Sequence, residues 1–133
     1  MNNLIEFSTS KKKELINITN KVEEIVSSSK VERGICHVFA PHATAALLIN
    51  EDEAGFKTDV EKLLDIWIPQ GNWAHDRVDN NATAHLAAAM IGQDRTIPIQ
   101  EGRLQLGTWQ EIFFVELDGP RERRKIIVQI VGE

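Results

Sequence analysis

The sequence has little cysteine and no long apolar run, and each absence excludes a class of protein. Cys36 is the single cysteine among 133 residues, so an intrachain disulfide and a cysteine-based zinc site are excluded. It lies in the apolar segment GICHVFA, which predicts a buried and unreactive thiol. No apolar run approaches the roughly 18 residues of a membrane span, and the N-terminal segment lacks the apolar core of a signal peptide. We therefore expect a cytoplasmic protein with no membrane partner.

Positive charge is also scarce. Lysine and arginine number 15 against 20 aspartates and glutamates, which gives a net charge of −5. A general nucleic-acid binder needs a basic face to neutralise phosphates, so we expect no nucleic-acid partner. The cluster from Arg121 to Lys125 does not reverse this balance, but it offers a place for one phosphate. The length fits a single domain over residues 1–133 that builds a core without disulfides.

Alternating apolar residues and turn residues predict about eight strands and three helices. The expected strands lie within residues 3–8, 13–18, 34–40, 45–50, 95–106 (a hairpin turning at Glu101-Gly102), 109–117 and 123–131. The expected helices are residues 20–30, 51–67 (capped by Asn50) and 81–90 (capped by Asp79 or Asn80 and closed by Gly92). The 15-residue segment 68–82 is rich in Pro, Gly, Asn and Asp, and a loop of this length is often functional. The pattern predicts an α+β fold with a largely antiparallel sheet.

The segment LQLGTWQEIFFVELDGPRERR carries more chemical detail than a strand requires. Gly107 indicates a bulge or a close approach of backbone. Trp109 adds a large flat surface, and Gln110 adds an amide that both donates and accepts hydrogen bonds. We interpret the segment as the wall of a site, although Trp109 also suits a core position. Gly107 and Thr108 leave the backbone approachable by an oxyanion or a phosphate.

Four histidines are the other source of reactive chemistry. His42, His75 and His85 lie in polar or turn-like settings, whereas His37 lies within an apolar strand and is expected to be structural. Imidazole is the commonest metal ligand and the usual acid or base near neutral pH. No local spacing such as HExxH is present, so the spacing alone does not define a metal site. Glu51 has two interpretations, a first-turn helix residue that favours the helix dipole, or a general base or partner of a ligand histidine.

Three segments together resemble one known family. PHATAALLINE, HDRVDNNATAHL and IPIQEGRLQLGTWQEIFFVELDGPRERR are similar to the YjbQ-like family of small proteins, whose members are described as secondary thiamine-phosphate synthases. The similarity extends from about residue 14 to residue 131, and GTWQ is its most specific part. The resemblance implies a compact α+β subunit in a homotrimer, with a site at or near the subunit interfaces.

The resemblance also implies roles for individual residues. His42, His75 and His85 match histidines that hold a divalent metal, with zinc as the expected ion, or magnesium with a pyrophosphate substrate. His42, Glu51 and Gln110 match catalytic positions. The implied contacts to substrate are made by Thr44, Asn81, Gly107, Thr108, Trp109 and Arg121. Ala43 stands where the family prefers Thr, which removes one hydroxyl beside His42.

Three functions follow from these residues. The resemblance implies that a pyrimidine pyrophosphate is coupled to a thiazole phosphate with release of pyrophosphate. A metal centre made of three imidazoles suits metal-assisted hydrolysis of a small phosphorylated or acyl substrate better than this transfer, since carboxylate-bound magnesium usually serves pyrophosphate. A non-catalytic trimer that binds a metal or ligand is the third. In each case we expect a small phosphorylated molecule as the partner.

Overall fold

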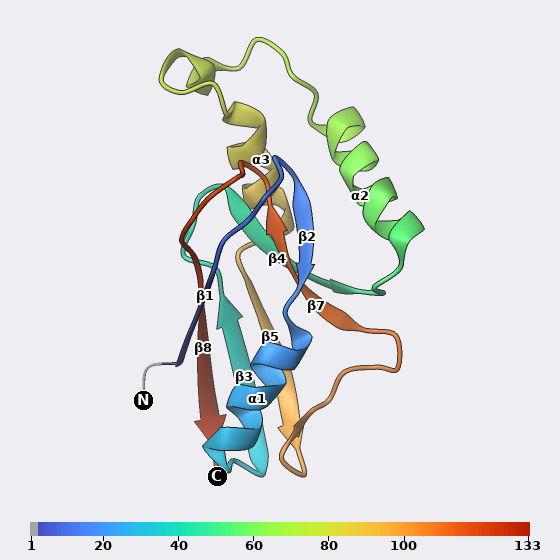
Figure 1. The fold of residues 1–133 in the computed structure, drawn as a ribbon, viewed down its shortest axis with the longest axis vertical. Coiled ribbons are helices and arrows are strands. Elements are labelled where there is room, and N and C mark those ends of the chain that lie inside the picture. The colour runs from blue at the N-terminus through green and yellow to red at the C-terminus, as the bar shows by residue number, and fades with distance from the viewer. Residues whose placement is uncertain (1–2) are drawn as a thin grey trace.

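The computed structural model describes residues 3–133 and has the α+β fold that the sequence predicts (Figure 1). The eight strands of this range are β1 (Asn3–Phe7), β2 (Glu14–Asn17), β3 (Arg33–Phe39), β4 (Ala45–Asn50), β5 (Asp94–Gln100), β6 (Arg103–Leu104), β7 (Glu111–Glu116) and β8 (Arg124–Gly132). The helices are α1 (Thr19–Ser29), α2 (Ala54–Trp67) and α3 (Ala82–Ile91), with a 3-10 turn η1 (Ala74–Arg77). None of the helices within residues 3–133 has the length and apolar character needed to cross a bilayer.

The strands form two sheets rather than one. A five-stranded sheet has the order β1-β8-β3-β5-β6, a three-stranded sheet has the order β2-β7-β4, and every neighbouring pair is antiparallel. The first two strands are consecutive in sequence but belong to different sheets, because β1 pairs with β8 while β2 pairs with β7. The prediction of antiparallel pairing is confirmed, and the division into two sheets is a feature that local alternation does not reveal.

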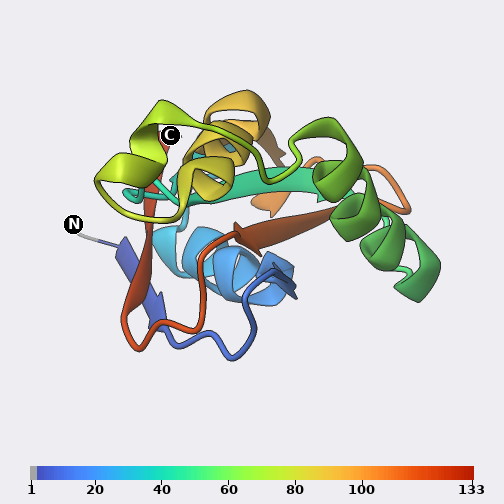
Figure 2. The same ribbon diagram turned by 90° about the horizontal axis from the view of Figure 1, so that it is seen from above.

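The three-stranded sheet lies between two apolar cores. Because successive strand residues point to opposite faces, Leu47 and Phe114 pack toward α1 and the five-stranded sheet, whereas Ala46 and Val115 pack toward α2 and α3. Figure 2 shows α1 on one side of β4 and β7 and the other two helices on the opposite side. All six residues from Ile112 to Leu117 are consequently buried. Cys36 lies in the first core, where burial, followed by the charge of Glu23, raises the pKa of its thiol to about 11.

The alanine-rich helix α3 packs closely on β4. Ala84, Ala87 and Ala88 are buried in the second core, and their small side chains let the helix approach the sheet. Gly92 ends the helix with φ of 100°, as its position in the sequence predicts. Leu86 and Met90 lie on the opposite side and remain exposed.

Several predicted element boundaries differ from the structure. The N-cap residue of α3 is Asn81 rather than Asp79 or Asn80. Helix α2 begins at Ala54 rather than residue 51, because the carboxylate of Glu53 accepts hydrogen bonds from the N–H groups of Gly55 and Phe56 and acts as the N-cap instead of Asn50. Strand β7 begins at Glu111 rather than residue 109. The predicted hairpin turn at Glu101-Gly102 is present, with both residues at positive φ.

Candidate functional site

The loop before α3 brings two histidines together. His75 in η1 and His85 in α3 have ring centroids 4.3 Å apart and an interplanar angle of 44°. They line a cavity of about 360 Å³, whose other walls come from Trp73, Ala74, Ala82 and Leu86. The Nδ1 atom of His75 is buried and has no hydrogen-bond partner among residues 3–133. Buried polar atoms are normally paired, so this nitrogen marks the cavity as a candidate ligand site.

A second cluster joins the start of α3 to the turn between β7 and β8. Asn81, the N-cap residue of α3, donates from Nδ2 to Oδ2 of Asp118 at 2.8 Å. Arg121 donates from Nε to the Asp118 carbonyl and from one terminal nitrogen to Oδ2, both at 2.9 Å. Burial alone would raise the pKa of Asp118, but Lys12, Asn81 and Arg121 lower it to about 2. Asp118 therefore stays ionised and holds Arg121 beside the helix that carries His85.

The orientation of the Asn81 amide follows from this contact. An ionised carboxylate only accepts hydrogen bonds, so the NH₂ group must face Asp118. The Oδ1 atom of Asn81 then points to a position where it is buried without a partner in the part of the chain that the structure describes. The corner between η1 and α3 thus contains two unpaired buried polar atoms, on Asn81 and His75. Asn81 was expected to bind substrate, and this atom is the one available for it.

His42 is engaged elsewhere, so one chain does not by itself bring the three expected histidines together. Its Nε2 atom lies 2.9 Å from the backbone nitrogen of Lys125 and 3.2 Å from the carbonyl oxygen of the same residue. The shorter contact, in which the Lys125 N–H donates, favours a neutral ring with its proton on Nδ1. Burial, and then the charge of Arg124, lower the pKa of His42 below 6.5. No group of three or more His, Cys, Asp or Glu side chains within residues 3–133 is arranged to hold a metal ion. One chain therefore supplies the His75–His85 pair, while His42 offers an Nδ1–H donor.

The expected site residues lie at opposite ends of the three-stranded sheet. The register of β4 and β7 pairs Ala45 with Glu116 at one end and Asn50 with Glu111 at the other. His42 and the Asp118–Arg121 turn adjoin the first end, whereas Glu51 and the GTWQ segment adjoin the second. Six strand residues separate the ends by roughly 20 Å. A single chain therefore does not bring Glu51 or GTWQ to the histidines (Figure 1).

The GTWQ segment is a hydrogen-bonded turn rather than a strand. The Gln110 N–H donates to the Gly107 carbonyl at 3.0 Å, and Oε1 of Gln110 accepts from the Gly107 N–H at 2.8 Å. A side chain at Gly107 would meet that amide oxygen at 3.3 Å. The turn presents Trp109 to solvent with 73% of its surface exposed, so the tryptophan is not part of a core within one chain. The Gln110 amide is used to hold the turn.

The sequence did not identify two buried charges, Glu116 and Arg124, which form an ion pair at the same end as His42. One feature of the sequence could have identified the pair: Glu116 lies between Val115 and Leu117 in an apolar run. A carboxylate that is buried in this way is rare without a partner. Strand alternation does predict that Arg123 and Arg124 face opposite ways, and Arg123 is exposed. Thr44, expected to bind substrate, is buried and its hydroxyl accepts from Arg124 at 3.0 Å.

The remaining positions lie outside both clusters. His37 contacts the Thr96 hydroxyl through Nδ1 at 2.9 Å and lies 3.6 Å from Asp94. It belongs to β3 of the five-stranded sheet, whereas His75 and His85 belong to η1 and α3. Ala43 is exposed in the loop beside His42.

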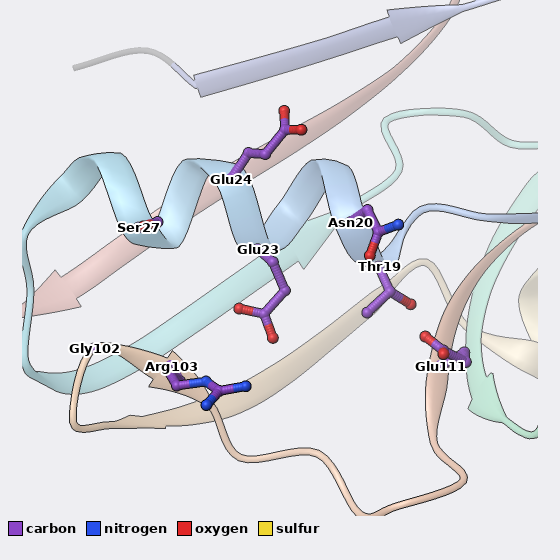
Figure 3. A pocket seen from close by; sticks show the side chains of 8 residues that line it. All are labelled: Thr19, Asn20, Glu23, Glu24, Ser27, Gly102, Arg103 and Glu111. Carbon is purple, nitrogen blue, oxygen red and sulfur yellow. The ribbon is translucent and has the colours of Figure 1, made fainter.

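A larger hollow lies elsewhere on the molecule. It is a groove of about 690 Å³ between α1 and the segment around Arg103, and Figure 3 shows the side chains that line it. It is lined by Thr19, Asn20, Glu23, Glu24, Ser27, Gly102, Arg103 and Glu111. Glu23 and Glu111 point toward Arg103 and Glu24 points away from it (Figure 3), so carboxylates outnumber the one guanidinium. A surplus of negative charge disfavours a phosphate, and the groove shares no lining residue with the histidine cavity. The smaller cavity is therefore the better candidate despite its size.

Comparisons with known proteins agree on one family. The family model described as UPF0047 protein YjbQ-like matches residues 3–133. A UPF0047 protein of Methanothermobacter thermautotrophicus is 44% identical over 94% of this chain and 87% of its own length. One of Archaeoglobus fulgidus is also 44% identical, over 92% and 96%.

Solved structures agree with the same assignment. A YbjQ-like protein of unknown function from Sulfolobus solfataricus superposes with a TM-score of 0.97 at 45% identity, and the alignment covers 100% of this chain and 97% of that one. A hypothetical protein from Aeropyrum pernix gives 0.95 at 40% identity, covering 100% and 99%. Full-length sequence similarity and a shared fold lead to the same conclusion: this chain belongs to the UPF0047 YjbQ-like family.

Proposed function

We propose that the protein is an enzyme acting on a small phosphorylated metabolite at the corner between η1, α3 and the β7–β8 turn. The observation that carries this proposal is the His75–His85 pair, which lines an apolar cavity of about 360 Å³ and includes a buried Nδ1 atom without a hydrogen-bond partner among residues 3–133. Enzyme sites typically combine an apolar cavity with a few convergent polar groups. The reaction that best fits the resemblance is coupling of a pyrimidine pyrophosphate to a thiazole phosphate with release of pyrophosphate.

The phosphate-binding part of the proposal rests on Arg121. Asp118 holds two of its N–H donors, and about half of the side chain remains exposed. An arginine fixed in this way presents the rest of its planar fork to a phosphate. The N-terminus of α3, joined to the same turn through Asn81, adds the positive end of a helix dipole. Because Nε2 of His42 contacts the Lys125 backbone, Nδ1 is the ring nitrogen left to donate to an anion.

The residues of the corner fit a divalent metal in part. His75 and His85 supply two adjacent imidazoles, and the unpaired Nδ1 of His75 is a nitrogen of the kind that zinc binds. The bound ion would supply positive charge for a phosphate oxygen or a leaving pyrophosphate. The remaining ligands would come from the substrate or from another subunit. Zinc is the ion we propose, with magnesium as the choice if pyrophosphate itself supplies oxygen ligands.

The distance between the expected site residues within one chain supports a site built from two subunits. The turn carrying Trp109 and the nearby Glu51 lie at the opposite end of the sheet from His42 and Arg121. A head-to-tail ring of three copies would bring the GTWQ end of one chain to the histidine end of the next. We therefore propose a homotrimer in which Glu51 and Trp109 reach the neighbouring cavity. Sedimentation at micromolar concentration tests this assembly, because a species of only 15.0 kDa would contradict it.

A second candidate function, metal-assisted hydrolysis, is favoured by the side chains that would hold the metal, which are histidines. Imidazole nitrogens hold zinc for hydrolysis, whereas pyrophosphate transfer usually relies on magnesium bound by carboxylates. In this alternative a water would attack a small phosphorylated or acyl substrate. Arg121 would bind its anionic group as in the synthase.

One assay separates the functions. Pyrophosphate release is measured with the pyrimidine pyrophosphate and the thiazole phosphate together, and with each alone, before and after removal of metal by a chelator. Release that needs both substrates supports the synthase, and release from one supports the hydrolase. The absence of release under all conditions, with saturable binding of pyrophosphate, would replace both with a non-catalytic binding protein.

A further inference from the structure

Glu116 and Arg124 form a buried ion pair between the two sheets. Glu116 is fully buried and Arg124 is 5% exposed. Arg124 donates to both carboxylate oxygens of Glu116, from Nε at 2.8 Å and from a terminal nitrogen. Burial alone would raise the pKa of Glu116, but hydrogen bonds from Arg124 and Thr9 outweigh it and hold that pKa below its ordinary value. The pair is thus charged on both sides at neutral pH.

The pair extends through hydrogen bonds into the turn that carries Arg121. The second carboxylate oxygen of Glu116 accepts from the N–H groups of Leu117 and Asp118, each at 3.0 Å. The first oxygen accepts from the Thr9 hydroxyl at 2.7 Å. The same hydroxyl accepts from the Arg121 N–H at 3.0 Å. Both ends of the Asp118–Arg121 turn are therefore fixed by one carboxylate and one hydroxyl.

The other partner extends to the loop that carries His42. Arg124 donates to the Thr44 hydroxyl at 3.0 Å and lies 3.4 Å from the Thr44 carbonyl. The backbone of the next residue, Lys125, donates to His42 itself. One buried pair consequently contacts three connections that are distant in sequence: those between β1 and β2, β3 and β4, and β7 and β8.

We propose that Glu116 and Arg124, with Thr9 and Thr44, form a positioning hub that fixes Arg121 and His42 for phosphate binding. The inference rests on the proposed function, because it assigns the hub a task at that same corner. None of these four side chains needs to touch the substrate. Each acts by fixing a backbone segment or side chain that does.

Stability alone does not explain such a pair. Taking two charges out of water costs as much as their attraction returns, so apolar residues of similar size often stabilise a fold equally well. Apolar residues in place of the pair could not accept hydrogen bonds from the backbone N–H groups of Leu117 and Asp118 or from the Thr9 hydroxyl, which in turn accepts from the Arg121 N–H. The charged pair therefore contributes directional hydrogen bonds that fix the turn, in addition to filling space. Small displacements of binding groups weaken a site strongly.

The test uses the full chain and inorganic pyrophosphate as the probe. Thr9→Val keeps the shape of the side chain but removes the hydroxyl that holds Arg121 and Glu116. Glu116→Gln removes the charge without changing size. Val128→Ala is the matched control, because Val128 is buried in β8 and pairs with Asn3 and Val38 rather than with a residue of the hub. Pyrophosphate affinity is measured by calorimetry, and hydrogen exchange is followed at the amides of Leu117, Asp118 and Arg121.

Thr9→Val is expected to weaken pyrophosphate binding at least about tenfold and to accelerate exchange at the three amides, whereas Val128→Ala lowers stability without either effect. If Glu116→Gln does not fold, Thr9→Val carries the test alone. Unchanged affinity and unchanged exchange in Thr9→Val would overturn the positioning hub. If the unaltered chain binds no pyrophosphate, the proposed function fails first. The hub is then judged by exchange, and equal rates in Thr9→Val and Val128→Ala would reject it.

Discussion

Asn81 donates a hydrogen bond to Asp118 at 2.8 Å, and this contact couples the start of helix α3 to the turn that carries Arg121. The two residues are 37 positions apart in sequence. Through them, the helix that bears His85 and the guanidinium that we propose as a phosphate ligand are held in one arrangement. Asp118 has a side chain only 11% exposed, so its charge is shielded from water and its contacts are strong.

Replacing Asp118 with asparagine is expected to destabilise the protein in a way that depends on pH. The folded state lowers the pKa of Asp118 from 3.8 to about 2, so the unfolded chain binds more protons between these values. The stabilisation is complete above about pH 4 and is lost as the pH falls toward 2. Urea unfolding at pH 7 should show a loss of about 2 kcal/mol for Asp118→Asn.

The difference in unfolding free energy between Asp118→Asn and the native protein should shrink as the pH approaches 2. Asp59→Asn, an exposed carboxylate on α2, is the control and should change little at any pH. A constant difference between Asp118→Asn and the native protein across this range would show that the carboxylate contributes through packing rather than charge.

Local patterns in the sequence predict the elements of this fold but not their partners. The end of α3 at Gly92 and the hairpin turn at Glu101-Gly102 are predicted correctly. Both require a backbone with positive φ, which glycine adopts readily, so the sequence marks these positions locally. The assignment of β1 and β2 to different sheets depends instead on pairing with β8 and β7. Contacts between residues 100 or more positions apart leave no periodic signal in one sequence.

The same limit applies to the candidate site. The sequence predicts that His42, His75 and His85 converge, and the structure places the rings of His75 and His85 4.3 Å apart. The use of His42 by the Lys125 backbone was not predictable, because it depends on how the loop before β4 packs beside β8. Glu116 and Arg124 were missed because a charged residue in sequence is most often solvated. Their burial follows from the packing of two sheets, which the alternation of residues does not specify.

Gly119→Ala is expected to lower stability because the β7–β8 turn has no room for a side chain. A Cβ atom at Gly119 would lie 2.1 Å from the Lys11 carbonyl oxygen and 2.9 Å from Cγ of Glu116. Relief of such overlap requires movement of backbone and typically costs about 1–3 kcal/mol. Gly71→Ala is the matched control, since the nearest atom lies at 3.7 Å. Thermal unfolding should separate the two variants, and equal midpoints would contradict the packing of this turn.

His42 is expected to titrate below its ordinary value of 6.5 with its neutral proton on Nδ1. Burial, then Arg124, disfavours the charged ring. Since the unfolded chain takes up this proton more readily, the contribution of His42 is full above pH 6.5 and declines as the pH falls below that value. Nitrogen-15 NMR of the imidazole reports both the tautomer and the titration. A proton on Nε2 at neutral pH would mean that the ring donates to Lys125 instead.

Binding of the metal and binding of the phosphate should depend on different residues of the corner between η1, α3 and the β7–β8 turn. Replacing His85 with alanine removes half of the imidazole pair and should abolish zinc binding. Arg121→Ala should leave metal content unchanged and weaken binding of pyrophosphate by about 10- to 100-fold, as expected when a charged hydrogen bond worth about 1.5–3 kcal/mol is removed. Metal analysis and calorimetry on the same samples measure both. Loss of metal in Arg121→Ala would show that the two subsites are not separate.

Mixed assemblies of two inactive variants should recover activity if the site spans two subunits. His85→Ala damages the histidine end of a chain, and Trp109→Ala damages the exposed turn at the other end of the sheet. In a head-to-tail ring each site takes one end from each of two neighbours. Equal mixing by unfolding and refolding then gives about a quarter of the sites with both ends intact. Pyrophosphate release near this fraction of the native rate would support the shared site. A mixture that assembles fully but stays inactive would mean that the Trp109 turn acts within its own chain or has no part in the site.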